Sequence, residues 1–282
     1  MAPTDTTTPA VPHLRLRDGI GMPWVGFGCF QVSPGETQGV VEEALEAGYR
    51  HFDTAAAYRN EREVGAALAA SGLPREDYFV TTKLWNTQQG HDPALAAFEA
   101  SLERLGLDHV DLYLIHWPVP SGGRLVETWR AFERIRGEEA ARTIGVSNFR
   151  IEDLELLERE TATRPTVNQI ELHPHLQQGE LRAWHHEHRI ATEAWSPLAQ
   201  GELLEQPIVT RIGNRRGKTP AQVILRWHLQ LGNVVIPKSV TPQRIRENIE
   251  IFDFELSHRE MAAIGDLDSG TRIGPEPATF TG

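Results

Sequence analysis

Short apolar runs alternate with longer amphipathic stretches along most of the chain. Eight of these runs have the length of strands and cover residues 24–30, 51–55, 78–85, 110–117, 143–149, 166–172, 190–198 and 233–239. Helix-like stretches lie between runs, for example over residues 37–48, 60–72, 93–106 and 219–232. This alternation predicts a parallel sheet whose strands are covered by helices. Eight such units predict an α/β fold, a closed (β/α)₈ TIM barrel, which typically takes about 250 residues.

Turn residues near the start of the chain favour this barrel over its main competitor. An open doubly wound sheet usually carries the motif G-x-G-x-x-G after its first strand. Here Gly19 and Gly21 are followed by Trp24 at the place of the third glycine, so the motif is absent. Asp18 and Gly19 instead lie between two short alternating runs and predict the turn of an N-terminal β-hairpin. We expect this hairpin to cover the bottom of the barrel.

The chain is predicted to form a single domain over residues 1–282, because no low-complexity linker divides it. Residues from about 1 to 12 are expected to be a flexible N-terminus. Residues from about 269 to 282 are rich in glycine and proline and predict an irregular C-terminal loop. We expect loops and this tail to shape a ligand pocket.

Charge and cysteine content exclude several classes of partner. The formal net charge of −11 argues against nucleic-acid binding, which depends on a basic surface. The lone cysteine, Cys29, allows no intrachain disulfide and is expected to be inert. The N-terminal residues lack a secretory signal pattern, and the longest apolar runs are too short for a membrane span. We therefore expect a cytoplasmic protein without a membrane partner.

Polar side chains interrupt or end three of the apolar runs. Asp53, Lys83 and His116 lie at the ends of the second, third and fourth predicted strands, and Tyr58 follows Asp53 by five residues. In barrels of this kind the catalytic groups come from the C-terminal ends of several strands. Because a buried lysine or aspartate is rare unless it is paired, we expect Asp53 and Lys83 to pair.

This cluster has the residue types needed for general acid catalysis. A lysine ammonium beside a tyrosine favours the phenolate, so Lys83 is expected to lower the pKa of Tyr58 below its usual value near 10. Tyr58 would then protonate an oxygen that gains negative charge, and His116 would orient that carbonyl group. The alternative interpretation is structural: a buried ion pair beside a tyrosine and a core histidine.

A basic turn follows the eighth apolar run and leads into a helix. It contains Lys238, Ser239, Val240, Thr241, Arg244 and Asn248. Lysine supplies a point charge and arginine a planar fork, and both suit a phosphate at the loops after strands seven and eight. Carbonyl reduction needs a hydride from a cofactor, and the chemistry alone leaves NAD(P)H and flavin open. The alternative is a solvated start of a helix.

Long motifs in this chain resemble the aldo-keto reductase superfamily nearly from end to end. They are HFDTAAAYRNEREVGAAL, TTKLWN, DLYLIHWP, IGVSNF, VNQIELHP, AWSPLAQG and VIPKSVTPQRIRENIEIFDFEL. Many family members carry a tyrosine at the position of Trp195, whereas tryptophan there resembles the bacterial diketogluconate reductase branch. The resemblance implies an NADPH-dependent oxidoreductase that reduces aldehydes, ketones or keto-sugars, with Tyr58 as the acid, Asp53 and Lys83 tuning it, and His116 orienting the substrate.

The resemblance also implies how the cofactor is held. Ser147, Asn148 and Gln169 match positions that hold the nicotinamide carboxamide near Asp53, and Trp195 matches an aromatic residue that stacks on the nicotinamide ring. Residues along the pyrophosphate would be Ser196, Leu198 and Gly201. The adenosine 2′-phosphate would lie at the turn that runs from Lys238 to Arg244, with Asn248 near the adenine.

Aromatic residues beside the strand ends have two interpretations. Phe30, Trp85 and Trp117 suit core packing, but clustered at the barrel top they would form an apolar substrate pocket, as at the matching positions of related reductases. Asn86 would add a polar contact. We favour the pocket, because Trp117 directly follows His116.

Two other functions compete with the reductase. A cofactor-binding protein without turnover, serving as a sensor or structural subunit, would share the fold, since fold alone does not define function. A metal-dependent barrel isomerase or aldolase would need clustered ligands. His185 and His188 share a helix face without a carboxylate or cysteine pattern, so we interpret that face as solvated and expect no metal site. The resemblance indicates a monomer.

Overall fold

Eight parallel strands form the centre of the protein, which is described from a computed structural model over residues 11–282. In chain order they are β3 (Phe27–Gly28), β4 (His51–Asp53), β5 (Phe79–Leu84), β6 (Val110–Ile115), β7 (Ala141–Ser147), β8 (Val167–Glu171), β9 (Ala191–Trp195) and β10 (Val234–Val235). A parallel bridge between Val25 and Val235 connects the two ends of this sheet, and the Gly26 amide donates to the Val235 carbonyl at 2.8 Å. The sheet thus closes, and the predicted TIM-barrel class is confirmed.

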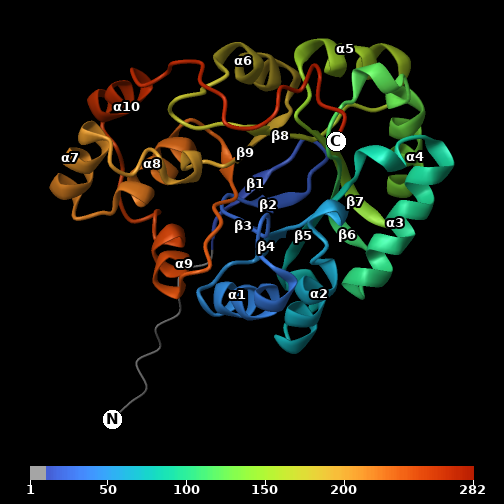
Figure 1. Ribbon diagram of the computed structural model, residues 1–282, viewed down its shortest axis with the longest axis horizontal. Coiled ribbons are helices and arrows are strands. Elements are labelled where there is room, and N and C mark those ends of the chain that lie inside the picture. The colour runs from blue at the N-terminus through green and yellow to red at the C-terminus, as the bar shows by residue number, and fades with distance from the viewer. Residues whose placement is uncertain (1–10) are drawn as a thin grey trace.

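Helices surround the strands (Figure 1). They are α1 (Pro34–Glu46), α2 (Glu61–Ala70), α3 (His91–Leu105), α4 (Leu125–Gly137), α5 (Ile151–Glu160), α6 (Gly179–His188), α7 (Pro207–Arg216), α8 (Pro220–Gln230), α9 (Pro242–Ile249) and α10 (His258–Gly265). Short 3₁₀ turns occupy Ala56–Tyr58, Arg75–Asp77, Asn86–Gln88, Pro120–Gly122 and Ala199–Gly201. No helix within residues 11–282 is both long enough and apolar enough to cross a membrane.

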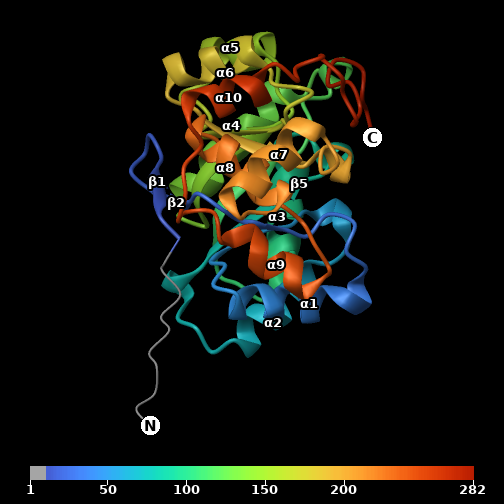
Figure 2. The same cartoon turned by 90° about the vertical axis from the view of Figure 1, so that its left-hand side faces the viewer.

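The predicted N-terminal hairpin is confirmed. Strands β1 (His13–Arg15) and β2 (Gly21–Pro23) pair antiparallel around a turn in which Gly19 has a φ of +92°. Leu16 and Met22 pack in one buried cluster with side chains from the first residues of several barrel strands. The hairpin therefore covers the N-terminal end of the barrel. Figure 2 shows it on the opposite side of the molecule from the C-terminus.

The two ends of the chain differ in what the structure describes. Most of the predicted flexible N-terminus, residues 1–10, lies outside the described residues. Residues 266–282, all of them described, contain neither helix nor strand and run along the surface after α10.

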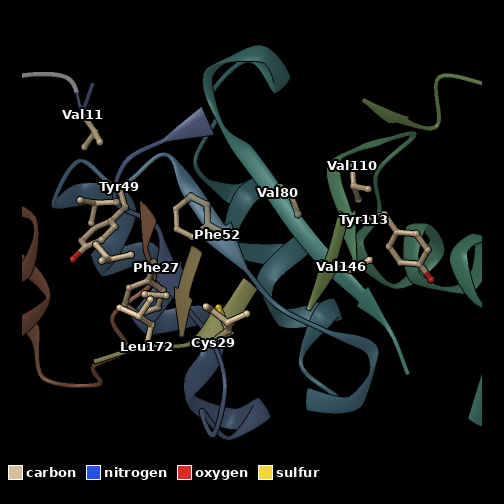
Figure 3. Close-up of a cluster of buried hydrophobic side chains, with 14 of the residues drawn as sticks. Val11, Phe27, Cys29, Tyr49, Phe52, Val80, Val110, Tyr113, Val146 and Leu172 are labelled. Atoms are coloured by element: carbon tan, nitrogen blue, oxygen red, sulfur yellow. The ribbon is translucent and has the colours of Figure 1, made fainter. Parts of the chain in front are cut away.

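The core fills the space between the barrel and its helices. Figure 3 shows part of it, with Phe52 and Val80 on neighbouring strands and Tyr113 on β6. The ring of Tyr113 stacks on that of Phe132 from α4, with centroids 4.5 Å apart. Such dense packing leaves the strand ends little freedom to move, which matters for the groups that they carry.

One prediction about the histidines is wrong. His185 does not lie on a solvated helix face, because its side chain is fully buried. Its ring nitrogens lie 2.9 Å from Thr192 Oγ1 and 3.0 Å from Asn168 Nδ2. His188 stacks on the Trp184 ring at 3.6 Å. Both side chains are used in packing, and no cluster of potential metal ligands occurs within residues 11–282.

The contact between α2 and α3 supports a stability test. A Cβ on Gly65 would overlap the Leu105 carbonyl, which is backbone and cannot move away. We expect Gly65→Ala to lower the free energy of unfolding by about 1–3 kcal/mol through overpacking, measured by urea denaturation. Gly137→Ala is the matched control, because nothing lies within 4 Å of a Cβ there. Equal stabilities of the two variants would contradict this close approach.

Candidate active site

A cavity of about 1570 Å³ opens at the C-terminal end of the barrel. Its wall includes Asp53, Ser147 and Trp195, the last residues of β4, β7 and β9, and Gln169 from the middle of β8. The alternation of strands and helices thus brings polar side chains that are distant in sequence to one place, as expected for the catalytic end of such barrels.

Lys83 lies fully buried behind the cavity wall. Its ammonium donates to Asp53 Oδ1 at 2.5 Å, to the Thr54 carbonyl at 3.0 Å and to the Tyr58 hydroxyl at 3.3 Å. All three N–H donors of the lysine are therefore used. The pairing expected from the sequence is present, and it places a positive charge directly behind the tyrosine hydroxyl.

The expected direction of the Tyr58 pKa shift is wrong. Burial raises the pKa of Tyr58 to about 12, and the Lys83 ammonium opposes this rise without overcoming it. Burial alone would lower the pKa of Lys83, but the Asp53 carboxylate and the Tyr58 hydroxyl raise it above its ordinary value. The tyrosine is consequently protonated and the lysine charged at neutral pH. Both are in the state that proton donation from Tyr58 requires.

His116 packs against Tyr58 in the cavity wall. The two rings meet edge to face with centroids 5.6 Å apart, and Trp85 packs on the histidine at 5.2 Å. Burial, together with the Lys83 charge, lowers the pKa of His116 well below 6.5. The imidazole is therefore neutral and can donate one hydrogen bond into the cavity.

A second hydrogen-bond network extends from Asp53 and His116 to other residues of the cavity wall. Gln169 Nε2 donates to Asp53 Oδ2 at 2.8 Å, so both oxygens of that carboxylate have a donor. Asn148 Nδ2 donates to the His116 carbonyl at 3.0 Å and to Ser147 Oγ at 3.0 Å. The Trp195 indole donates to Asn148 Oδ1 at 2.8 Å. These hydrogen bonds fix the directions of the side chains in the cavity wall.

The basic turn after β10 lines the far part of the same cavity. Lys238, Ser239, Arg244 and Asn248 lie in its wall, as do Ser196, Leu198 and Gly201 from the turn after β9. Within residues 11–282, neither Lys238 nor Arg244 takes part in an ion pair, since every pair found there involves other groups. Two free cations at one part of the cavity wall fit a phosphorylated ligand.

Three predicted contacts lie outside the cavity wall. Val240 and Thr241 do not line it, because the chain turns outward there to begin α9, and Val240 is 43% exposed. Asn86 is buried, and its Nδ2 donates to the Thr281 carbonyl at 3.1 Å. The amide of Asn86 thus holds the C-terminal tail. By contrast, Phe30, Trp85 and Trp117 all line the cavity.

The tail supplies cavity residues that the sequence did not identify. They are Ile273, Gly274, Pro275 and Phe280. Glu171 at the end of β8 accepts the amides of Ile273 at 2.6 Å and of Gly274 at 2.9 Å. Phe280 packs on Trp117 with ring centroids 4.5 Å apart. The signal available in the sequence was an aromatic residue in a tail otherwise rich in glycine and proline.

Fold and site together define an α/β-barrel protein whose cavity is lined by Tyr58, which contacts the buried Lys83, and by the basic side chains of Lys238 and Arg244. The model of the Aldo/keto reductase family matches residues 19–269, and the chain belongs to this family. An aldo-keto reductase of Mycolicibacterium smegmatis is 57% identical over 269 residues, covering 95% of this chain and 98% of that protein. Methylglyoxal reductase DkgA of Yersinia pestis is 52% identical over 271 residues, with coverage of 95% and 97%. The resemblance found in the sequence is confirmed.

A solved structure extends the comparison to a ligand. A mutant of Gox0644 in complex with NADPH matches with a TM-score of 0.93 and 44% sequence identity, covering 96% of this chain and 99% of that chain.

The buried ion pair supports a prediction. Lys83→Met leaves the Asp53 carboxylate without its cation, so we expect the free energy of unfolding at pH 7 to fall by about 3–5 kcal/mol. Without Lys83 the pKa of Asp53 rises, so acidification protonates the carboxyl group, and the gap to wild type narrows as pH falls. Denaturation curves from pH 5 to 8 measure this change.

The double variant Asp53→Asn with Lys83→Met is the control. It removes both charges, so it should be more stable at pH 7 than Lys83→Met alone. A double variant that is no more stable would show that the penalty does not come from an unpaired charge.

Proposed function

We propose that this protein is an NADPH-dependent reductase that converts aldehydes, ketones or keto-sugars to alcohols, with Tyr58 as the general acid. One observation carries the proposal. The Tyr58 hydroxyl lies in the wall of the cavity with the Lys83 ammonium 3.3 Å behind it. A proton donor supported by a buried cation suits an oxygen that becomes negatively charged during reaction.

NADPH, when bound, supplies the hydride that the carbonyl carbon accepts. The residues of this chain fit that cofactor. Lys238 and Arg244 would hold its 2′-phosphate, with Asn248 near the adenine and Ser196, Leu198 and Gly201 along the pyrophosphate. The network of Ser147, Asn148 and Gln169 would hold the carboxamide, and Trp195 would stack on the ring. The NADPH in the complex of the Gox0644 mutant supports this assignment by similarity.

Tyr58 would donate its proton to the substrate oxygen as the C=O electron pair moves onto that atom. The phenolate left behind lies beside Lys83, whose charge favours it, and solvent returns the proton. Neutral His116 would donate a hydrogen bond to the same oxygen and so fix the direction of the carbonyl group. Asp53 would act through Lys83, by holding the ammonium in place.

The aromatic part of the cavity would bind the remainder of the substrate. Phe30, Trp85, Trp117 and Phe280 form an apolar wall near Tyr58, with ring centroids of Phe30 and Tyr58 5.0 Å apart. Such a wall favours small carbonyl compounds with apolar or weakly polar ends. Relatives named methylglyoxal reductase support small dicarbonyls as the first compounds to assay.

Replacing Tyr58 by phenylalanine tests the acid. We expect Tyr58→Phe to lower kcat for a dicarbonyl substrate by about 100- to 10,000-fold, while NADPH still binds, because only the proton donor is lost. NADPH absorbance and quenching of tryptophan fluorescence measure the two properties. Tyr78→Phe, outside the cavity wall, is the matched control. Near-normal kcat in Tyr58→Phe would exclude the acid role, and a wild type that binds NADPH without turnover would favour a sensor.

Replacing Arg244 tests the phosphate assignment. We expect Arg244→Ala to raise the KM for NADPH about tenfold with little effect on NADH, because NADH lacks the 2′-phosphate that the guanidinium would bind. Arg246→Ala is the matched control: it lies on the same helix, pairs with Glu43 and does not line the cavity. Equal effects of Arg244→Ala on both nucleotides would contradict the assignment.

A further inference from the structure

Glu193 is a buried carboxyl group that the proposed chemistry does not use. It lies in the middle of β9 with no exposed surface and does not line the cavity. Its Oε2 accepts a hydrogen bond from Gln169 Nε2 at 2.8 Å. Its Oε1 has no hydrogen-bond partner, and His51 Nε2 lies 3.8 Å from it. Burial of such a group is costly, so a leucine-sized apolar residue would be the simpler choice for stability.

The partner of Glu193 explains why an acceptor is useful there. Gln169 has two N–H donors, and they go to Asp53 Oδ2 and Glu193 Oε2, each at 2.8 Å. Within the described part of the chain, Gln169 Oε1 accepts no hydrogen bond, while the residue lines the cavity. The amide therefore offers the cavity an oxygen and no hydrogen.

A single carboxylate would define this orientation less well. If only Asp53 accepted from Gln169, the second N–H would be free, and the amide would present both a donor and an acceptor. A flipped amide would place its oxygen against the Asp53 carboxylate and would leave both N–H groups without their acceptors. Asp53 thus opposes the flipped orientation, and Glu193 accepts the N–H that would otherwise be free.

We propose that Glu193 is a positioning residue: by accepting the second N–H of Gln169, it makes Gln169 Oε1 the acceptor for the amino group of the nicotinamide carboxamide. The inference rests on the proposed function, since it requires that NADPH binds in this cavity. Glu193 does not touch the cofactor, but it determines which atom of Gln169 contacts it.

This role does not depend on the charge of Glu193. Burial, with the nearby Asp53 carboxylate, raises the pKa of Glu193 to about 8, against the hydrogen bond from Gln169 and the Lys83 charge. A protonated carboxyl group still has an oxygen that accepts from Gln169. Glutamine at this position should therefore serve in place of glutamate, whereas leucine should not.

Two nucleotides separate the carboxamide contact from all other cofactor contacts. They are NADPH and its reduced 3-acetylpyridine analogue, in which a methyl group replaces the carboxamide amino group. Dissociation constants come from quenching of tryptophan fluorescence. We expect wild type to bind NADPH about tenfold more tightly than the analogue, because the analogue cannot donate to Gln169 Oε1.

The variants then test Glu193 itself. Glu193→Leu should bind both nucleotides with similar affinity, and Glu193→Gln should keep the preference for NADPH. Thr192→Val is the matched control, because it removes a buried acceptor one residue away that contacts His185. It should lower stability and leave the preference unchanged.

Several outcomes would overturn the assignment. They are a wild type that binds both nucleotides equally, a folded Glu193→Leu that keeps the full preference, or a folded Glu193→Gln that loses it. The last comparison stands even if Glu193→Leu does not fold. Failure of wild type to bind NADPH at all would instead refute the proposed function, so the two failures are distinct.

Discussion

The Asp53 carboxylate joins the two halves of the candidate site. One of its oxygens accepts from the Lys83 ammonium, and the other accepts from the Gln169 amide. The first contact supports the tyrosine that would donate a proton, and the second belongs to the network that would hold the nicotinamide. Because β4 and β8 are not neighbours in the sheet, only its closure through Val25 and Val235 brings these side chains together. The position of the site therefore depends on the backbone contact that joins the two ends of the sheet.

Burial of these groups has opposite effects on their pKa values, and both effects serve the same chemistry. It keeps Tyr58 protonated, since its pKa rises to about 12, and it keeps His116 uncharged. A charged His116 beside Lys83 would repel the ammonium on which Tyr58 depends. Lys83 is thus the one cation of this cluster, and its charge is matched by Asp53. Because Lys83 is buried, its charge acts more strongly on a developing phenolate than it would in water.

Residues at strand ends were the most predictable from the sequence. A strand end is determined by the local pattern, and the barrel then places all eight ends together, so Asp53, Lys83 and His116 followed from spacing alone. Contacts that depend on the path of a loop were harder to predict from the sequence. Val240 and Asn86 lie in turns whose path depends on the tail and on α9, and alternation of apolar residues carries no information about such paths. The sign of the Tyr58 pKa shift was also missed, because it depends on how far burial outweighs one neighbouring charge.

The C-terminal tail lines the apolar wall of the cavity but does not carry Tyr58, Lys83 or His116. It makes no strand or helix with the barrel and is held by hydrogen bonds to a few side chains, above all to Glu171. Gly274 lies against the Trp195 ring so closely that a Cβ would overlap it, so the tail reaches the ring that we propose to stack on the nicotinamide. Changes at Phe280 would alter the apolar wall without moving Tyr58 or Lys83, which belong to the barrel and its first loops. A rigid barrel with a replaceable covering segment can therefore keep one reaction while the carbonyl compounds that it accepts change.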